Sequence, residues 1–152
     1  MTKTKYYKAQ NNFSEFYSFI SENLQEYEKK TNSKDEKIYD IRERTFRFAQ
    51  RILEIAEMLP KTVECTVIRT QLVKAGTSTG ANVEEGDGCV TKKDFANKFT
   101  IARKEAKESR YWLRLISGKY IKAEFIENDI IESQEIIKIL SSIINKTKSP
   151  QR

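Results

Sequence analysis

Residues 71–85 read Gln71-Leu-Val-Lys-Ala-Gly-Thr-Ser-Thr-Gly-Ala-Asn-Val-Glu-Glu85, and this stretch decides the fold. Two glycines inside a helix each cost about 1 kcal/mol relative to alanine, which a chain accepts where another element packs closely or the helix bends. We therefore predict a central helix with its partners pressed against Ala75, Gly76 and Gly80. Residues on both sides keep the three- and four-residue steps of one helical face: Cys65, Ile68, Leu72, Ala75, Thr79 and Val83. A loop is the alternative, but the unbroken phase favours a helix.

The length and composition of the chain limit its class. A chain of 152 residues can form one domain with a real core. It has no run of roughly 20 apolar residues, the length of a membrane span, and no apolar signal-peptide core near Met1. Cys65 and Cys89 lack the spacing of a metal site. We expect a cytoplasmic protein that neither spans nor binds a membrane.

The absence of histidine removes two kinds of chemistry. A His-based catalytic triad is impossible, and so is a ferritin-like metal site built on Glu-x-x-His pairs. A carboxylate cluster that binds a metal stays open, and its candidates are Glu84, Glu85, Glu105 and Glu108. Surface charge is the better interpretation of these residues. We therefore expect no enzyme activity, no metal and no cofactor.

Four amphipathic segments in residues 38–146 predict an all-α fold, an antiparallel four-helix bundle. The helices are expected near 40–59, 63–85, 91–117 and 124–145. Asp40 and Thr91 are the expected N-caps, and Gly86-Asp-Gly88 is expected to end the second helix in the left-handed conformation. Residues 1–37 predict an N-terminal arm with one added amphipathic helix, and residues 147–152 a frayed tail.

The first of these helices carries two apolar seams. One seam follows Ile41, Thr45, Phe48, Ile52, Ile55 and Leu59, and the second follows Phe46, Ala49, Leu53 and Ala56. Two seams make a wide apolar arc, so the helix is expected to touch more than one neighbour. On the next two helices, small residues (Gly76 and Gly80, then Ala102 and Ala106) are expected to allow a close approach of the second helix to the third.

The positive charge is concentrated in residues 91–119. This segment has nine Lys or Arg against three Asp or Glu, an excess of +6 that equals the net charge of the whole chain. On the third helix the basic residues recur at steps of four, three and four, with Lys104 beside them: Arg103, Lys107, Arg110 and Arg114. Such a stripe is usually a solvated face, but its one-sidedness favours nucleic-acid binding. The alternative is that it pairs with the acids of the fourth helix: Glu127, Asp129, Glu132 and Glu135.

Two smaller groups of side chains remain. Asn82, Glu105 and Glu108 are interpreted as a structural polar network between the second and third helices, because a buried amide or carboxylate needs partners. Tyr111 and Trp112 are able to stack on nucleic-acid bases. For Trp112, packing in the core or in a subunit seam is the favoured interpretation.

Several ordered pieces of the sequence resemble one known family. They are Asp40-Ile-Arg-Glu-Arg-Thr-Phe-Arg-Phe-Ala49, Leu59-Pro-Lys-Thr62, Gln71 to Asn82, Asp94-Phe95, Lys98, Ile101-Ala102, Lys104-Glu-Ala106, Glu108 and Tyr111-Trp-Leu113. Together they look like the 23S rRNA intervening-sequence, or S23, family of bacterial four-helix bundles, over about residues 38–118. The segment Gly86-Asp-Gly-Cys89 and the arm 1–37 depart from the family pattern. Asn82, Glu105 and Glu108 match family positions, but no catalytic residues are carried over.

The resemblance implies an assembly more than an activity. Such proteins are similar to accessory proteins of diversity-generating retroelements, which form basic homopentamers beside a reverse transcriptase. The expected function is therefore that of a non-catalytic homopentamer that binds RNA or DNA, with a reverse transcriptase as a further partner. A structural scaffold without nucleic-acid binding is the alternative.

Overall fold

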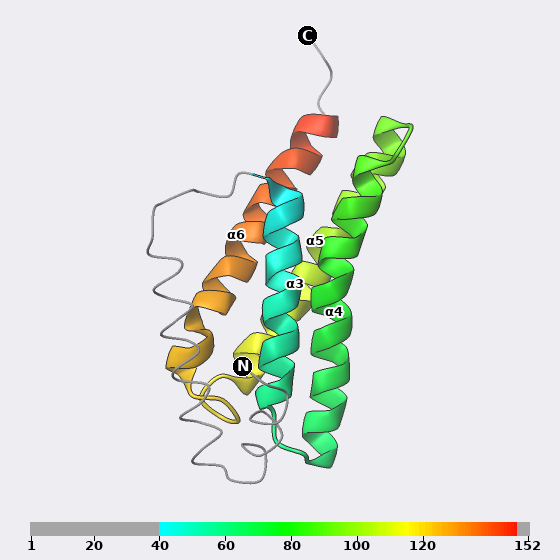
Figure 1. Cartoon of the computed structure of the whole chain (residues 1–152). Coiled ribbons are helices and arrows are strands. Elements are labelled where there is room, and N and C mark those ends of the chain that lie inside the picture. Colours follow the sequence, from blue (N-terminus) through cyan, green and yellow to red (C-terminus); the bar gives the residue numbers. More distant parts are fainter. Residues whose placement is uncertain (1–39, 149–152) are drawn as a thin grey trace, which may run out of the picture. The chain divides into compact units, whose positions relative to one another are not determined.

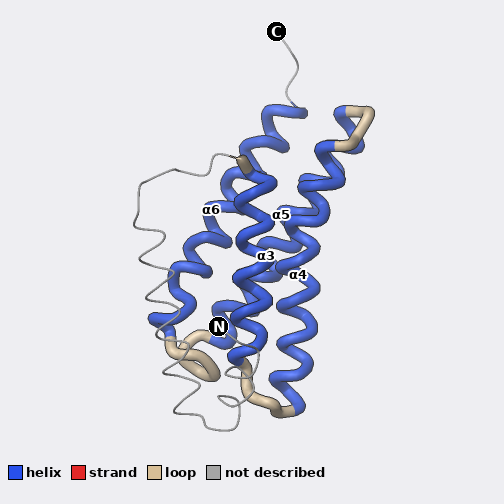
Figure 2. Tube along the Cα trace, in the orientation of Figure 1, coloured by secondary structure: helices blue, strands red, loops and turns tan. Residues whose placement is uncertain are grey.

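The structure is a computed structural model that describes residues 40–148 of the chain. It contains four α-helices that run alternately up and down, joined by short loops (Figures 1 and 2). Their bounds are α3 Ile41–Met58, α4 Val63–Asp87, α5 Lys92–Ile116 and α6 Ala123–Lys148. The predicted all-α four-helix bundle is thus confirmed. The predicted arm of residues 1–37 and its added helix lie outside the described residues.

Polar side chains fix where three of the helices begin. The Asp40 side chain accepts a hydrogen bond from the Arg42 N–H at 2.9 Å, as an N-cap does. Thr62 accepts from the N–H of Cys65 in the same way. Thr91 accepts from the Asp94 N–H at 3.1 Å, which confirms the predicted start of α5. The last helix, α6, continues to Lys148, so residues 147 and 148 of the predicted frayed tail are helical, and the rest of that tail lies outside the described residues.

The predicted end of α4 needs a correction. The helix runs through Gly86 to Asp87, and Gly88 has a φ of −86°, not the expected left-handed value. Its N–H bonds back to the Glu85 carbonyl at 3.2 Å, so a tightened last turn ends the helix. Gly86 instead makes room for α5, because a Cβ there would lie 2.6 Å from the Phe99 ring. Among the described glycines only Gly118, in the loop after α5, has a positive φ.

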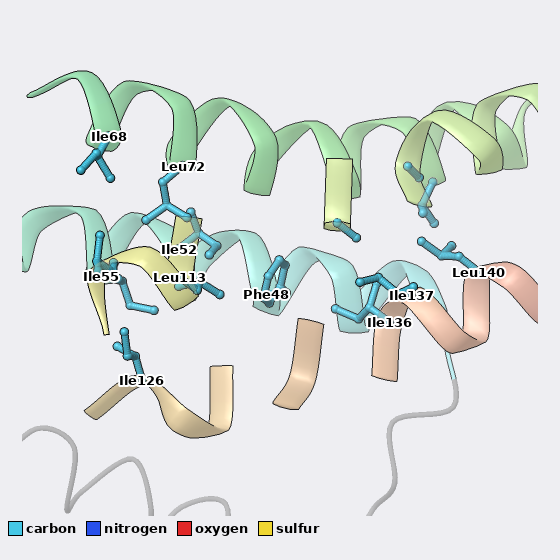
Figure 3. Packing of buried hydrophobic residues seen from close by; sticks show 14 of the residues in the cluster. Phe48, Ile52, Ile55, Ile68, Leu72, Leu113, Ile126, Ile136, Ile137 and Leu140 are labelled. Carbon is cyan, nitrogen blue, oxygen red and sulfur yellow. The ribbon is translucent and has the colours of Figure 1, made fainter. Parts of the chain in front are cut away.

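The core lies between the four helices and is built from their predicted seams. Each helix packs on its neighbour in sequence, and α6 closes the ring against α3. Figure 3 shows side chains from all four helices turned toward this common interior. The fully buried large residues include Ile52, Ile55, Leu72, Leu113, Ile126, Ile136 and Leu140. Burying one such side chain stabilises the fold by about 1.5–3 kcal/mol, so these seams hold the bundle together.

The glycines of α4 bring it against α3. A Cβ on Gly76 would lie 2.7 Å from both Cγ atoms of Ile52, and one on Gly80 would lie 3.3 Å from the Thr45 carbonyl oxygen. The close approach predicted for these glycines is therefore present, but the partner is α3 and not the third body helix, α5. The reason is register: Gly76 and Gly80 are one turn apart and share the face that meets α3. On α5, Ala102 and Ala106 are both fully buried.

The apolar residues of these helices do not form a membrane span. None of the helices in residues 40–148 is long and apolar enough to cross a membrane. Each helix instead turns one set of apolar side chains toward the shared core, as expected for helices in a bundle.

We predict that Gly76→Ala lowers the free energy of unfolding by about 1–3 kcal/mol, as overpacking does, although alanine has the better helix propensity by about 1 kcal/mol. The added methyl must displace the branched Ile52 side chain. Chemical denaturation measures the change. Gly88→Ala is the matched control, since its Cβ would lie 3.7 Å from the nearest atom, and it should change stability by less than about 0.5 kcal/mol. A Gly76→Ala protein more stable than wild type would contradict the close contact.

Candidate nucleic-acid interface

The basic stripe lies along one face of α5. Its members Arg103, Lys104, Lys107, Arg110 and Arg114 all fall within the helix, which keeps them in line over about three turns. Lys104, Lys107 and Arg114 are exposed, and Arg103 and Arg110 are half-buried. The other side of α5 carries its buried seam: Phe99, Ala102, Ala106, Ser109, Leu113 and Ile116. Core packing of that seam therefore fixes the direction in which the stripe points.

No member of the stripe forms an ion pair with an acidic residue of the described chain. Three of the four acids of α6 that were the alternative partners are paired elsewhere, and the fourth, Glu127, forms no ion pair with the stripe among the described residues. Glu132 pairs with Arg44 and Asp129 with Arg51, both on α3, and Glu135 pairs with Lys138 within α6. The stripe therefore keeps its positive field on the outside of the bundle.

Two ion pairs fasten α6 to α3. Arg44 forms a bidentate pair with Glu132, with Nε to Oε1 at 2.5 Å and Nη2 to Oε2 at 2.8 Å. Arg51 donates from Nε to Asp129 at 3.1 Å and from Nη2 to the Phe125 carbonyl at 3.0 Å. Parallel N–H···O bonds of this kind fix orientation as well as distance. They fix the rotation of α6 so that the carboxylates of Asp129 and Glu132 face α3.

The Arg51–Asp129 pair is the more buried of the two. The Arg51 and Asp129 side chains are 13% and 12% exposed. Burial raises the pKa of the Asp129 carboxyl, and the charge and hydrogen bonds of Arg51 offset only part of that rise. Pairing with Arg51 therefore offsets part of the free-energy cost of burying the Asp129 charge. Removing Arg51 would leave that charge buried without a partner and would destabilise the fold.

Hydrogen bonds do not join Asn82, Glu105 and Glu108 into a network within the described residues. The Asn82 amide donates to the carbonyl and hydroxyl oxygens of Ser78, one turn earlier in α4, at 2.9 and 3.1 Å. The Glu108 carboxylate accepts from the Trp112 Nε1–H at 3.2 Å, within α5. An ion pair between Lys98 and Glu85 instead links α4 with α5.

The two aromatic residues of α5 have different surroundings. Trp112 is half-buried and packs against the core cluster, in line with its favoured interpretation. Tyr111 is 56% exposed and meets Trp112 edge to face, with ring centroids 4.9 Å apart. Tyr111 is therefore the ring available to a ligand, next to the basic stripe.

The carboxylates considered for a metal do not gather in one place. In the part of the chain that the structure describes, no three His, Cys, Asp or Glu side chains are placed to hold a metal ion. Glu85 is paired with Lys98, and Glu108 is bonded to Trp112. That the protein is not an enzyme stays a prediction.

Comparison with known protein families matches residues 37–142 to the one described as 23S rRNA-intervening sequence protein. The chain belongs to that family. A crystal structure of a protein with unknown function from the S23 ribosomal protein family of Bacteroides thetaiotaomicron is 39% identical to this chain. The match covers 69% of this chain and 98% of that chain, with a TM-score of 0.64. No curated protein matches the chain.

The stripe lies within the part of the chain that matches the 23S rRNA-intervening sequence protein family. The matched residues 37–142 contain the whole stripe, both α3–α6 ion pairs and most of the described helices. The solved relative from Bacteroides thetaiotaomicron is a protein of unknown function, so the role of the stripe rests on the residues of this chain.

Sequence reasoning missed the two arginines that fasten α6. Arg44, Arg47 and Arg51 were visible as a polar face of the first helix, but nothing in their spacing named their partners. The usable signal was a second, acidic series on the last helix, Asp129 and Glu132, at the spacing of one helical face. Matching the two series would have assigned these acids to α3.

We predict that Arg51→Met lowers the free energy of unfolding by about 3–5 kcal/mol at neutral pH, because it leaves the buried Asp129 carboxylate without its partner. The loss should shrink as the pH falls toward 4. The folded-state pKa of Asp129 lies above its unfolded value, so the folded state binds the extra proton and stability rises on acidification through that window. Denaturation curves at pH 4.5 and 7 measure this.

The double variant Arg51→Met/Asp129→Leu is the control for that prediction. It removes both charges and should recover most of the lost stability. A loss in Arg51→Met that is equal at both pH values would show that Asp129 does not depend on Arg51.

Proposed function

We propose that this protein is a non-catalytic, homo-oligomeric accessory protein that binds RNA or DNA through the basic stripe of α5. The observation that carries the proposal is the set of five cations on one helix face with no acidic partner among residues 40–148. Unpaired Lys and Arg side chains on one face can neutralise backbone phosphates, and this electrostatic contact supplies essentially all of non-specific nucleic-acid binding. The proposal also places the protein in the cytoplasm.

Oligomer formation is supported by the second apolar seam of α3. Phe46 and Leu53 are 58% and 45% exposed, although the sequence places them on an apolar face. Beside Phe46 lies a hollow of about 620 Å³ between α3 and α4, whose apolar lining includes Ala49, Gly80 and Ala81. Further copies of the chain would cover this face, since exposed apolar patches mark interaction sites. The resemblance to retroelement accessory proteins favours five copies and makes a reverse transcriptase a candidate partner.

In a symmetric oligomer, each subunit would contribute one copy of the stripe. Around a homopentamer, five copies of α5 would present their cations as one basic belt. Electrostatic attraction to phosphates is independent of base sequence, so we expect weak sequence preference and strong salt dependence. The alternative function, a scaffold whose charge only favours solubility, shares the oligomer and lacks the binding.

We predict that wild-type protein binds structured RNA or duplex DNA at low salt and that Arg103→Gln, Lys107→Gln and Arg110→Gln together weaken this binding. Each phosphate contact contributes about −0.9 to the log–log salt slope on duplex DNA and about −0.7 on single strands, so the triple variant should have a flatter slope. Fluorescence anisotropy across a salt series measures both quantities.

The control for charge alone is a triple glutamine variant of Lys61, Lys74 and Lys122, which are exposed and lie outside the stripe. It makes the same change in net charge and should keep the wild-type slope. No binding by the wild type at low salt, or the same slope in both triple variants, would contradict binding through the stripe and favour the scaffold function.

For the assembly, we predict a sedimentation-equilibrium mass of about five times the 17.8 kDa of one chain at micromolar concentration. Phe46→Lys with Leu53→Lys should dissociate the oligomer while the helical content stays unchanged, because both side chains lie outside the core. Val63→Lys, at an exposed position where α4 begins, is the matched control. A monomeric wild type would rule out the oligomer.

A further inference from the structure

A hollow of about 310 Å³ lies between α5 and α6, at the centre of the stripe. Three of the five stripe cations line it: Lys107, Arg110 and Arg114. Tyr111 and, from α6, Gln134 and Ile137 complete the lining, so none of its residues is acidic. The lining is therefore rich in hydrogen-bond donors and has a formal charge of +3.

Arg110, which lines this hollow, carries a buried polar group without a partner among the described residues. Its Nε–H is buried and has no hydrogen-bond partner in the described chain. A buried donor without an acceptor costs the free energy of its lost hydration, and native proteins leave few such groups. Because Asp129 and Glu132 are paired with α3, Glu135 is paired with Lys138, and no acid of the described chain lines the hollow, a described carboxylate does not meet this need. Because the Arg110 side chain also lines the hollow, an acceptor that a ligand brings there would meet it once the guanidinium turns toward the ligand.

The chemistry of the lining defines that ligand. A phosphate group offers several acceptor oxygens to the planar fork of an arginine, and two arginines and a lysine are present. Tyr111 lines the same hollow and exposes more than half of its surface, so an unpaired base next to the phosphate would have a ring on which to stack. Bases in a duplex are already stacked and do not reach it.

We infer that the α5–α6 hollow is a nucleotide subsite that takes one backbone phosphate of single-stranded nucleic acid at Arg110, with the neighbouring base on Tyr111. This rests on the proposed function and deepens it: the rest of the stripe would attract any polyanion, and the hollow would favour an unpaired strand.

The test compares a single-stranded oligonucleotide with a duplex of the same sequence, by isothermal titration at fixed salt. Arg110→Lys keeps the charge but removes the Nε–H, and it should weaken single-strand binding about ten-fold or more, since a hydrogen bond to a charged group is lost. Arg47→Lys, at an exposed position of α3 outside both the stripe and the hollow, is the matched control and should change it less than two-fold. Tyr111→Ala should weaken single-strand binding at least five-fold, and Tyr111→Phe should restore it.

A second variant, Gln134→Glu, separates a specific loss of binding from a loss caused by misfolding. Gln134→Glu places a carboxylate in the hollow, where it would neutralise Arg110 and exclude phosphate. We expect a higher melting temperature together with lost preference for the single strand. Gln50→Glu, on the exposed surface of α3, makes the same charge change and should do neither.

The outcomes separate this inference from the proposed function. Wild-type binding in which Arg110→Lys and Arg47→Lys behave alike, or in which Tyr111→Ala affects both probes equally, would overturn the subsite and leave the stripe as the binding surface. No binding of either probe by the wild type would overturn both.

Discussion

The contact between Ile52 of α3 and the bare backbone at Gly76 of α4 constrains the rest of the bundle. The branched side chain occupies the space that a Cβ would need, and one turn later Gly80 lies against the Thr45 carbonyl. Two helices that meet this closely have little freedom to slide or rotate, because packed interiors tolerate few gaps or overlaps. Their fixed pairing gives α5 and α6 a defined surface on which to close the core.

Closure of the core also distributes the charges. Arg44 and Arg51 on α3 pair with Glu132 and Asp129 on α6, so these two acids of the last helix fasten it to the first. Helix α5 packs against α6 with its stripe cations unpaired among the described residues, and a hollow lined by three of them lies between the two helices. The same ion pairs that orient α6 thus leave a positive face on α5. In our account the binding surface is a consequence of how the bundle is fastened.

How far the sequence predicts this structure depends on the range of each interaction. The seams, the N-caps Asp40 and Thr91, and the close approach at Gly76 were predictable because helical period and capping are local properties. The partner of Gly76, the role of Gly86 beside Phe99, and the capture of Asp129 by Arg51 were not, since each depends on the rotation of one helix against another. The same limit applies to the site: the stripe was visible along α5, but the hollow needs Gln134 from α6.

Protection of individual lysines by nucleic acid tests the central claim most directly, because it reports where phosphates lie without altering the protein. The protein would be acetylated briefly, with and without single-stranded RNA, and the modified lysines quantified by mass spectrometry. Our account predicts that RNA protects Lys104 and Lys107, while Lys61 and Lys74 react equally in both samples. Equal reactivity of Lys104 and Lys107 with and without bound RNA, or protection at Lys61 and Lys74 instead, would contradict it.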